Sequence, residues 1–243
     1  MQHRRNAATL VRQSARRIYA NSGFDTRAID GWNEYKYKRT EQFILRSGSS
    51  ILCKSRATLD AGAGERVYDW MPSNRISLDR YLVQISKKRW AIVADLELLP
   101  FPDKSFDLAF CIGSAINYVS AAEALNELAR VIVPGGHLFL HFETSTSFEQ
   151  LFKPAWGASA HLNRTVNASH TDLVWIYSPK YIRNLLKGLQ FRVLSEDRFH
   201  IFSSLCSRLG MPQQHAHKFS QLDHFSLFLK SFADDVVILA ERT

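Results

Sequence analysis

The chain has 243 residues, of which 46% are hydrophobic and 22% charged, with a formal net charge of +8. This composition excludes extensive disorder, and no apolar run approaches the roughly 18 residues needed to cross a bilayer, so we expect neither a transmembrane segment nor a secretory signal. Three cysteines lie far apart and the histidines lack accompanying ligands, which predicts no disulfide framework, no metal site and a reducing compartment such as the cytoplasm.

The first 54 residues form a basic arm followed by a covering helix. Five arginines precede the first acid, Asp25, and Leu10, Val11, Ser14 and Ile18 could share a helical face. A transit segment, a membrane-surface arm and a solvated end all fit this pattern, so peripheral membrane contact stays open. Residues 30–52 predict a helix that covers the first strand and ends at Ser47-Gly-Ser-Ser.

The stretch from Ala57 to Gly64 organises the remaining domain, residues 55–243. A short apolar run there ends in Asp60 and two glycines, which predicts a buried strand turning sharply beneath a ligand. Asp79 follows Asp60 by 19 residues and is placed to accept hydrogen bonds from ribose hydroxyls at the end of a second strand. Residues 65–70 predict the crossover helix between these strands, ending near residue 72.

The next elements alternate in the same way. Apolar runs predict strands at residues 90–95, 108–112 and 137–142, and helical spacing predicts a helix over residues 120–133 that Pro134-Gly-Gly ends. Strands that alternate with helices form a mostly parallel sheet. The sequence therefore predicts an α/β fold.

Several segments in this order carry a resemblance to a known family. They are Leu59-Asp-Ala-Gly-Ala-Gly, Asp79, Asp95, the stretch Leu99-Pro-Phe-Pro-Asp-Lys-Ser-Phe-Asp, and Glu127-Leu-Ala-Arg-Val-Ile-Val-Pro-Gly-Gly. Together they resemble the class I S-adenosylmethionine-dependent methyltransferases, specifically the type 11 family. The resemblance implies a Rossmann-like, doubly wound, seven-stranded sheet, mostly parallel, whose antiparallel last strand would be residues 236–240, preceded by residues 191–195.

The resemblance also implies a set of residues that bind S-adenosylmethionine. Asp60, Ala61, Gly62 and Gly64 would line the methionine part of the cofactor, Asp79 would hold the ribose, and Arg80 would lie beside the adenine. Asp95 would accept a hydrogen bond from the adenine amino group, and Leu96 would pack on the adenine ring. Cys111, Ile112 and Asn117 would border the sulfonium. His141, near the end of the fifth strand, is the candidate general base, against the alternative of a packed core histidine.

Three other functions compete with an active methyltransferase. Many relatives have a third glycine where Glu65 or Arg66 stands, which leaves open a scaffold or regulator that binds the cofactor poorly. A dinucleotide-binding dehydrogenase is disfavoured because Val67 replaces the last glycine of G-x-G-x-x-G. A nucleic-acid methyltransferase is disfavoured because residues 111–115 lack the acidic or amide residue, two prolines and aromatic typical of base-methylating enzymes.

The acceptor must be selected by parts added to this core. Residues 144–178 and 200–235 are two such additions, and the second predicts two amphipathic helices broken near Gly210. They could simply cover the sheet, or form a lid or membrane-facing platform. We expect a small-molecule acceptor, either a saccharide, a lipid-linked compound or a natural product; the oligomeric state is open.

Overall fold

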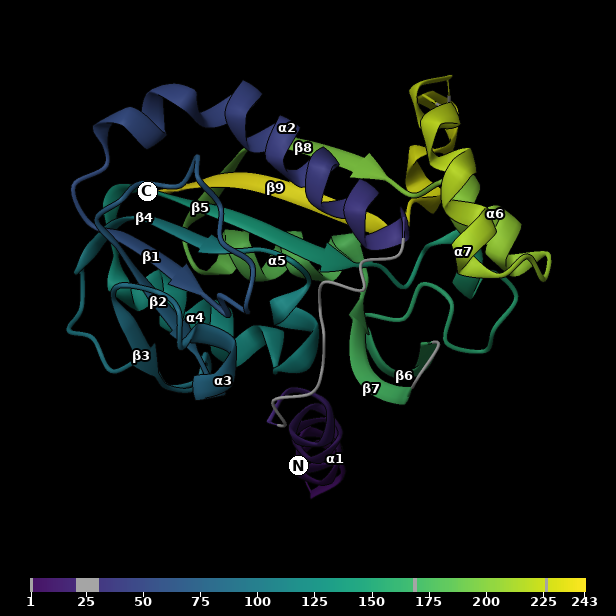
Figure 1. Ribbon diagram of the computed structural model, residues 1–243, viewed down its shortest axis with the longest axis horizontal. Helices are drawn as coiled ribbons and strands as arrows, with labels where there is room; N and C mark the ends of the chain where they lie inside the picture. Colours follow the sequence, from purple (N-terminus) through teal and green to yellow (C-terminus); the bar gives the residue numbers. More distant parts are fainter. Residues whose placement is uncertain (1, 21–30, 168–169, 226) are drawn as a thin grey trace.

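A seven-stranded sheet forms the centre of the molecule (Figure 1). The computed structural model describes residues 2–20, 31–167, 170–225 and 227–243. The strand order is β3-β2-β1-β4-β5-β9-β8, and β9 runs antiparallel to both β5 and β8 while the other pairs are parallel. The strands are β1 Thr58–Ala61, β2 Arg75–Asp79, β3 Ala91–Val93, β4 Phe106–Cys111, β5 Ile132–Glu143, β8 Phe191–Phe199 and β9 Asp235–Arg242. The predicted Rossmann-like sheet with an antiparallel last strand is confirmed.

Helices cover both faces of this sheet, as a doubly wound fold requires. On one face lie α4 (Ala121–Val131) and α5 (Pro179–Gly188), whose apolar stripes bury Leu125, Leu128 and Ile182 against the strands. On the other face lies α2 (Gly31–Lys54), as Figure 1 shows. The repeat of apolar residues in α4 at helical spacing accounts for its burial.

Helix α2 differs from expectation in its end and in its place. It continues through Ser47-Gly-Ser-Ser to Lys54, because Gly48 has a packing role: a Cβ there would lie 2.4 Å from Cζ of Phe139. The helix packs on β5, β8 and β9, so the expectation that it covers the first strand was wrong. Its Phe43 and Ile44 join Phe139 in the second of two hydrophobic clusters.

The connection from β1 to β2 contains no helix, so the crossover helix predicted over residues 65–70 was wrong. Tyr68 and Met71 are buried in this connection and join the cluster beneath α2, while Val67 is 54% exposed. The Trp70 ring meets Phe110 of β4 edge-on, at 5.8 Å between ring centroids. Aromatic side chains in an irregular segment thus fill the space that a crossover helix would occupy. A short helix, α3 (Leu82–Ile85), follows β2.

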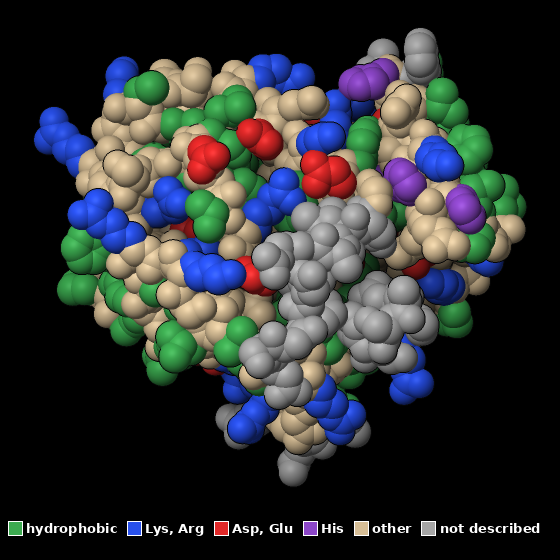
Figure 2. Space-filling model, in the orientation of Figure 1, with side chains coloured by type: hydrophobic (Ala, Val, Ile, Leu, Met, Phe, Trp, Pro, Cys, Tyr) green, Lys and Arg blue, Asp and Glu red, His purple; other side chains and the backbone are tan. Residues whose placement is uncertain are grey.

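A hairpin that the sequence analysis did not anticipate forms a second, two-stranded sheet. Its strands β6 (Ala160–Asn167) and β7 (His170–Tyr177) pair antiparallel beside the main sheet. Helix α1 (Gln2–Tyr19) packs on β7 and on the 3-10 helix η1 (Ala115–Tyr118). Its buried stripe contains Val11, Ala15 and Ile18, whereas Leu10, expected on this face, is 52% exposed. Figure 2 shows Lys and Arg side chains gathered at the lower tip of the molecule, where α1 lies.

Short helices form much of the two segments added to the core, one after β5 and the other between β8 and β9. After β5 comes η2 (Phe148–Gln150), and between β8 and β9 lie α6 (Phe202–Arg208), α7 (Gln213–Ala216), η3 (His217–Phe225) and η4 (Leu227–Phe232). The predicted break near Gly210 is confirmed, with φ of 93° at this residue. After the break one helix was expected, but residues 213–232 form the short helices α7, η3 and η4. No helix among the described residues is long and apolar enough to cross a membrane.

Candidate functional site

A cavity of about 590 Å³ lies at the carboxyl ends of β1, β2, β4 and β5. This is the edge at which open α/β sheets bind ligands, and the volume suits a small-molecule site. Eight of the twelve residues expected in the site line this cavity: Asp60, Gly62, Gly64, Asp79, Arg80, Asp95, Leu96 and Ile112. The sheet therefore brings most of the expected residues together.

The turn after β1 leaves its backbone bare toward the cavity. Gly62 and Gly64 have φ values of 71° and 53°, a region that glycine adopts without strain. The amides of Gly62 and Ala63 both donate to the carbonyl of Leu78, at 2.9 Å. A Cβ on Gly62 would lie 2.4 Å from the Cβ of Ala115, so this position accepts no side chain without movement.

Asp60 is buried beneath this turn and is held by a lysine. Lys88 Nζ donates to Asp60 Oδ2 at 3.2 Å and to the carbonyl of Ala63 at 2.9 Å, and both side chains are almost fully buried. Burial raises the pKa of Asp60, and the charge of Lys88 opposes that shift. Lys88 was not expected here, and it fixes the conformation of the glycine turn.

The Asp79 carboxylate faces two backbone amides at the end of β2. Gly64 N donates to Oδ2 at 3.1 Å, and Tyr81 N donates to Oδ1 at 3.0 Å. Burial raises the pKa of Asp79, while these hydrogen bonds favour its ionised form. The carboxylate is therefore fixed in orientation at the rim of the glycine turn.

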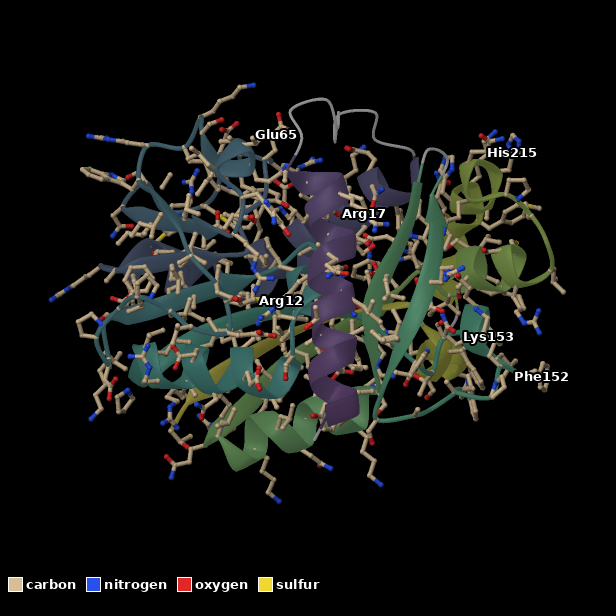
Figure 3. The ribbon with its side chains drawn as sticks, turned by 90° about the horizontal axis from the view of Figure 1, so that it is seen from below. Arg12, Arg17, Glu65, Phe152, Lys153 and His215 are labelled. Carbon is tan, nitrogen blue, oxygen red and sulfur yellow. The ribbon has the colours of Figure 1, made fainter. Side chains whose placement is uncertain are left out.

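Asp95 lies under the N-terminal helix. It pairs with Arg80 and, at 3.5 Å, with Arg12 of α1, which also contacts Glu97. Partial burial acts to raise the pKa of Asp95, but Arg80 and the amide of Glu97 lower it below its ordinary value. Figure 3 shows α1 lying across the molecule between the strands of the main sheet and the hairpin, with Arg12 on the side of the main sheet. Helix α1 thus covers this end of the site.

Four expected residues lie behind the cavity wall. Ala61 and Cys111 are in the hydrophobic core, where burial raises the pKa of the Cys111 thiol to about 12. Asn117 is fully buried and donates to the carbonyls of Glu143 and Trp175. His141 is also fully buried: its Nδ1 accepts from the amide of Ser114 at 3.1 Å, and its Nε2 lies 2.9 Å from Asp235 Oδ1.

A cluster of charged side chains that sequence reasoning missed forms the other end of the site. Lys36 Nζ of α2 lies 2.7 Å from Glu143 Oε1 and 3.5 Å from Asp235 Oδ1, and Lys36 and Glu143 line the cavity together with Glu149 and Asp234. We name these five residues the acidic cluster. Two of them carried a usable signal: Glu143 follows a predicted parallel strand, and Asp234 precedes an antiparallel one, so both reach the same edge of the sheet. Lys36, within a basic helix, carried none.

Aromatic side chains complete the wall. Trp32, Tyr19, Tyr37 and Tyr118 line the cavity. The Tyr19 and Tyr118 hydroxyls lie 2.9 Å apart, and Tyr118 donates to Asp172 Oδ2 at 2.7 Å. This chain of hydrogen bonds joins α1, η1 and β7 over the site.

Comparisons with known proteins show which family the sequence resembles. Residues 59–140 match the type 11 family model described as "Methyltransferase domain". A demethylmenaquinone methyltransferase of Lactiplantibacillus plantarum is 36% identical over 73 residues, which is 30% of this chain and 30% of that relative. The expected resemblance to class I S-adenosylmethionine-dependent methyltransferases is confirmed.

Solved structures share the fold over nearly the whole chain. The PH0226 protein from Pyrococcus horikoshii covers 93% of this chain and 95% of its own, with a TM-score of 0.59 and 14% identity. The 1,6-didemethyltoxoflavin-N1-methyltransferase of Burkholderia thailandensis, solved with 1,6-didemethyltoxoflavin and S-adenosylhomocysteine, covers 99% and 90%, with a TM-score of 0.55 and 14% identity. At this identity the likeness concerns the fold.

Proposed function

We propose that this chain, whose residues 59–140 match the type 11 methyltransferase domain, transfers the methyl group of S-adenosylmethionine to a small-molecule acceptor. The observation that carries the proposal is the bare glycine turn, which opens onto the same cavity as the strand-end carboxylates Asp79 and Asp95. Such a turn admits a ligand against the backbone, and the carboxylates accept hydrogen bonds from its hydroxyl and amino groups.

The residues present fit this cofactor. Gly62 and Gly64 would contact the methionine part, because both line the cavity and a Cβ built on Gly64 would have no atom within 4 Å. Asp79 would accept from the ribose hydroxyls, and Asp95 from the adenine amino group beside Arg80 and Leu96. When bound, S-adenosylmethionine supplies an electrophilic methyl group. Ile112 would border it, while Ala61, Cys111 and Asn117 would support that wall from behind.

The protein contributes mainly orientation and exclusion of water. Helix α1 covers the site, and the aromatic wall keeps the acceptor in place. His141 acts as a positioning residue in this proposal: it holds Ser114, which lines the cavity, and Asp235 in the acidic cluster. A direct proton transfer from the acceptor to His141 would have to pass through one of these neighbours.

A small-molecule acceptor is supported by the size of the cavity and by the solved relative that holds 1,6-didemethyltoxoflavin. A saccharide, lipid-linked or natural-product acceptor and a cytoplasmic location stay predictions. Exposed Phe152 and Leu209 adjoin the basic residues Lys153 and Arg208 in the sequence, and Arg208 Nε donates to the carbonyl of Leu151, which favours contact of this part with an anionic membrane surface. Figure 3 shows Phe152 and Lys153 at that end of the molecule.

Methyl transfer is tested by incubating the purified protein with S-adenosylmethionine labelled in its methyl group and with a small-molecule extract, DNA or RNA in parallel. We expect label in the small-molecule fraction. Label confined to nucleic acid would replace the acceptor class. Absence of transfer together with no micromolar affinity for S-adenosylhomocysteine would favour the alternative of a methyltransferase-like scaffold.

A further inference from the structure

We propose that the methyl acceptor is an amine, bound as a cation by Asp234 and Glu149 at the β5–β9 end of the cavity. The inference rests on the proposed function and names the acceptor class of the same site. Both carboxylates line the cavity, where Trp32 also forms part of the wall.

The backbone fixes the position of the acidic cluster. Glu143 ends β5 and pairs in register with Asp235, the first residue of β9. Asp234 is held directly beside them because Thr144 N donates to its carbonyl at 2.7 Å. Glu149 follows on η2, and Glu143, Glu149 and Asp234 all line the cavity. These carboxylates therefore lie at β5 and β9, away from the glycine turn and Asp79 that would hold the cofactor.

The charges in the acidic cluster do not balance. Lys36 pairs with Glu143 and Asp235, and His141 and His200 occupy the two carboxylate oxygens of Asp235 at 2.9 and 2.6 Å. Despite burial, these partners hold the pKa of Asp235 well below its ordinary value. Lys36 is thus shared between Glu143 and Asp235, and Asp235 also has both histidines as partners.

Within the described part of the chain, Asp234 and Glu149 lack such partners. Among the residues that the structure describes, no donor makes a hydrogen bond to either carboxylate, although Asp234 is only 8% exposed. The side-chain oxygen of Gln150, which also lines the cavity and is 3% exposed, lacks a donor too. The charge of Lys153 acts to lower the pKa of Glu149, but the Lys153 side chain is exposed to solvent. Three acceptors therefore line the cavity without a donor from residues 2–20, 31–167, 170–225 or 227–243.

Buried carboxylates of this kind are costly unless a cation or a hydrogen-bond donor meets them. Burial raises the pKa of Asp234 well above its ordinary value, and nearby Glu149 and Asp235 raise it further. An ammonium group offers a positive charge and several N–H donors at once, whereas a hydroxyl offers one donor and no charge. Trp32, whose ring stacks on His200 at 4.2 Å between centroids, lines the same cavity, and an aromatic ring in the wall suits a cation.

Two other ligands fit less well. An anionic acceptor would meet three carboxylates against one lysine. A metal ion needs carboxylates grouped around one point, and no such group of three His, Cys, Asp or Glu side chains occurs in the part of the chain that the structure describes.

The chemistry balances with an amine. The bound ammonium gives one proton to the Asp234 carboxylate, and the nitrogen lone pair then forms a bond to the methyl carbon. The carbon–sulfur bond breaks with its electron pair left on sulfur, which becomes a neutral thioether. The methylated nitrogen carries the positive charge, and Asp234 releases its proton to water when the product leaves.

The test uses three probes of one shape: phenethylamine, neutral 2-phenylethanol and anionic phenylacetate. Each is titrated by calorimetry into the full chain saturated with S-adenosylhomocysteine. We expect the amine to bind at least about tenfold more tightly than the alcohol, as a charge-assisted hydrogen bond predicts. This preference should fall to about threefold or less in Asp234→Asn and in Glu149→Gln. Glu123→Gln, which neutralises an exposed carboxylate on α4, is the matched control and should keep it.

The expected preference for the amine, and its loss in the two variants, would support an amine acceptor. Equal or tighter binding of the alcohol or phenylacetate, no binding of the amine, or a preference unchanged in both variants would overturn the inference. Thermal unfolding of each variant shows whether it is folded, and two variants are used so that a failure of one to fold does not end the test. Wild-type protein that binds no S-adenosylhomocysteine would instead contradict the proposed function.

Discussion

Replacement of Asp79 by Asn tests the cofactor-binding half of the site. The carboxylate of Asp79 is oriented by the amides of Gly64 and Tyr81 at 3.1 and 3.0 Å, so it stands ready to accept from a ligand without rearrangement. Asn keeps the size and one acceptor oxygen but removes the negative charge. The variant therefore loses the negative charge, and its side-chain NH2 cannot accept from one of the two backbone amides, so thermal unfolding of the variant is measured beside its affinity.

The expected loss follows from the strength of such bonds. A hydrogen bond to a charged group contributes about 1.5 to 3 kcal/mol, so loss of one to the ribose hydroxyls should raise the dissociation constant of S-adenosylhomocysteine by about 10- to 150-fold. Calorimetry measures this change, with Asp69→Asn, an exposed carboxylate in the same connection, as the control. A folded Asp79→Asn protein whose affinity changes by less than about threefold would remove Asp79 from the site.

Three further changes test other parts of the account. Gly62→Val should abolish S-adenosylhomocysteine binding and destabilise the fold by about 1 to 3 kcal/mol, because its Cβ meets Ala115, whereas Gly157→Val, with similar φ and open space, should keep binding. Arg12→Ala should cost less than about 1 kcal/mol in urea unfolding, since its ion pairs are partly exposed; a cost above about 2 kcal/mol would show that α1 is held mainly by this residue. Asp234→Asn should match the stability of the wild type near pH 4 and exceed it increasingly toward pH 8. The pKa of Asp234 is raised in the folded state, so the folded wild-type protein holds this proton more tightly than the unfolded chain does. The wild type therefore loses stability as the pH rises above the unfolded pKa of about 4, and the variant does not. Lower stability of this variant at pH 8 would contradict that reading.

Most strands of the sheet were predictable because local patterns of residues indicate them. Apolar runs ending in acids identified β1, β2 and β3, and the helical spacing of α4 identified the element before β5. The motifs of the type 11 family then supplied the antiparallel last strand. Each of these signals spans few residues and depends little on distant parts of the chain.

Long-range packing decided the elements that were missed. The residues after Gly64 have no helix because Tyr68 and Met71 insert beneath α2, and α2 extends past Gly48 because Phe139 of β5 needs that space. Neither partner is visible from the local sequence. The hairpin β6–β7 likewise depends on α1, whose Ser14 hydroxyl donates to Asp172 at 3.0 Å across 158 residues of sequence.

The site divides in the same way. Its end beside the glycine turn was predicted because Asp60, Asp79 and Asp95 lie at or just after the ends of strands that the sequence predicts. Its end at the acidic cluster was missed because Lys36 and Asp234 come from elements far apart in the chain, and they meet only when β9 inserts between β5 and β8.

A crystal structure of the protein with S-adenosylhomocysteine tests the central claim most directly. We predict that the ribose hydroxyls lie within hydrogen-bonding distance, about 2.5 to 3.0 Å, of Asp79, that the methionine part contacts Gly62, and that the sulfur faces the acidic cluster. Crystals grown at saturating ligand that show the cavity without it, or a ligand bound elsewhere on the molecule, would contradict the proposed function.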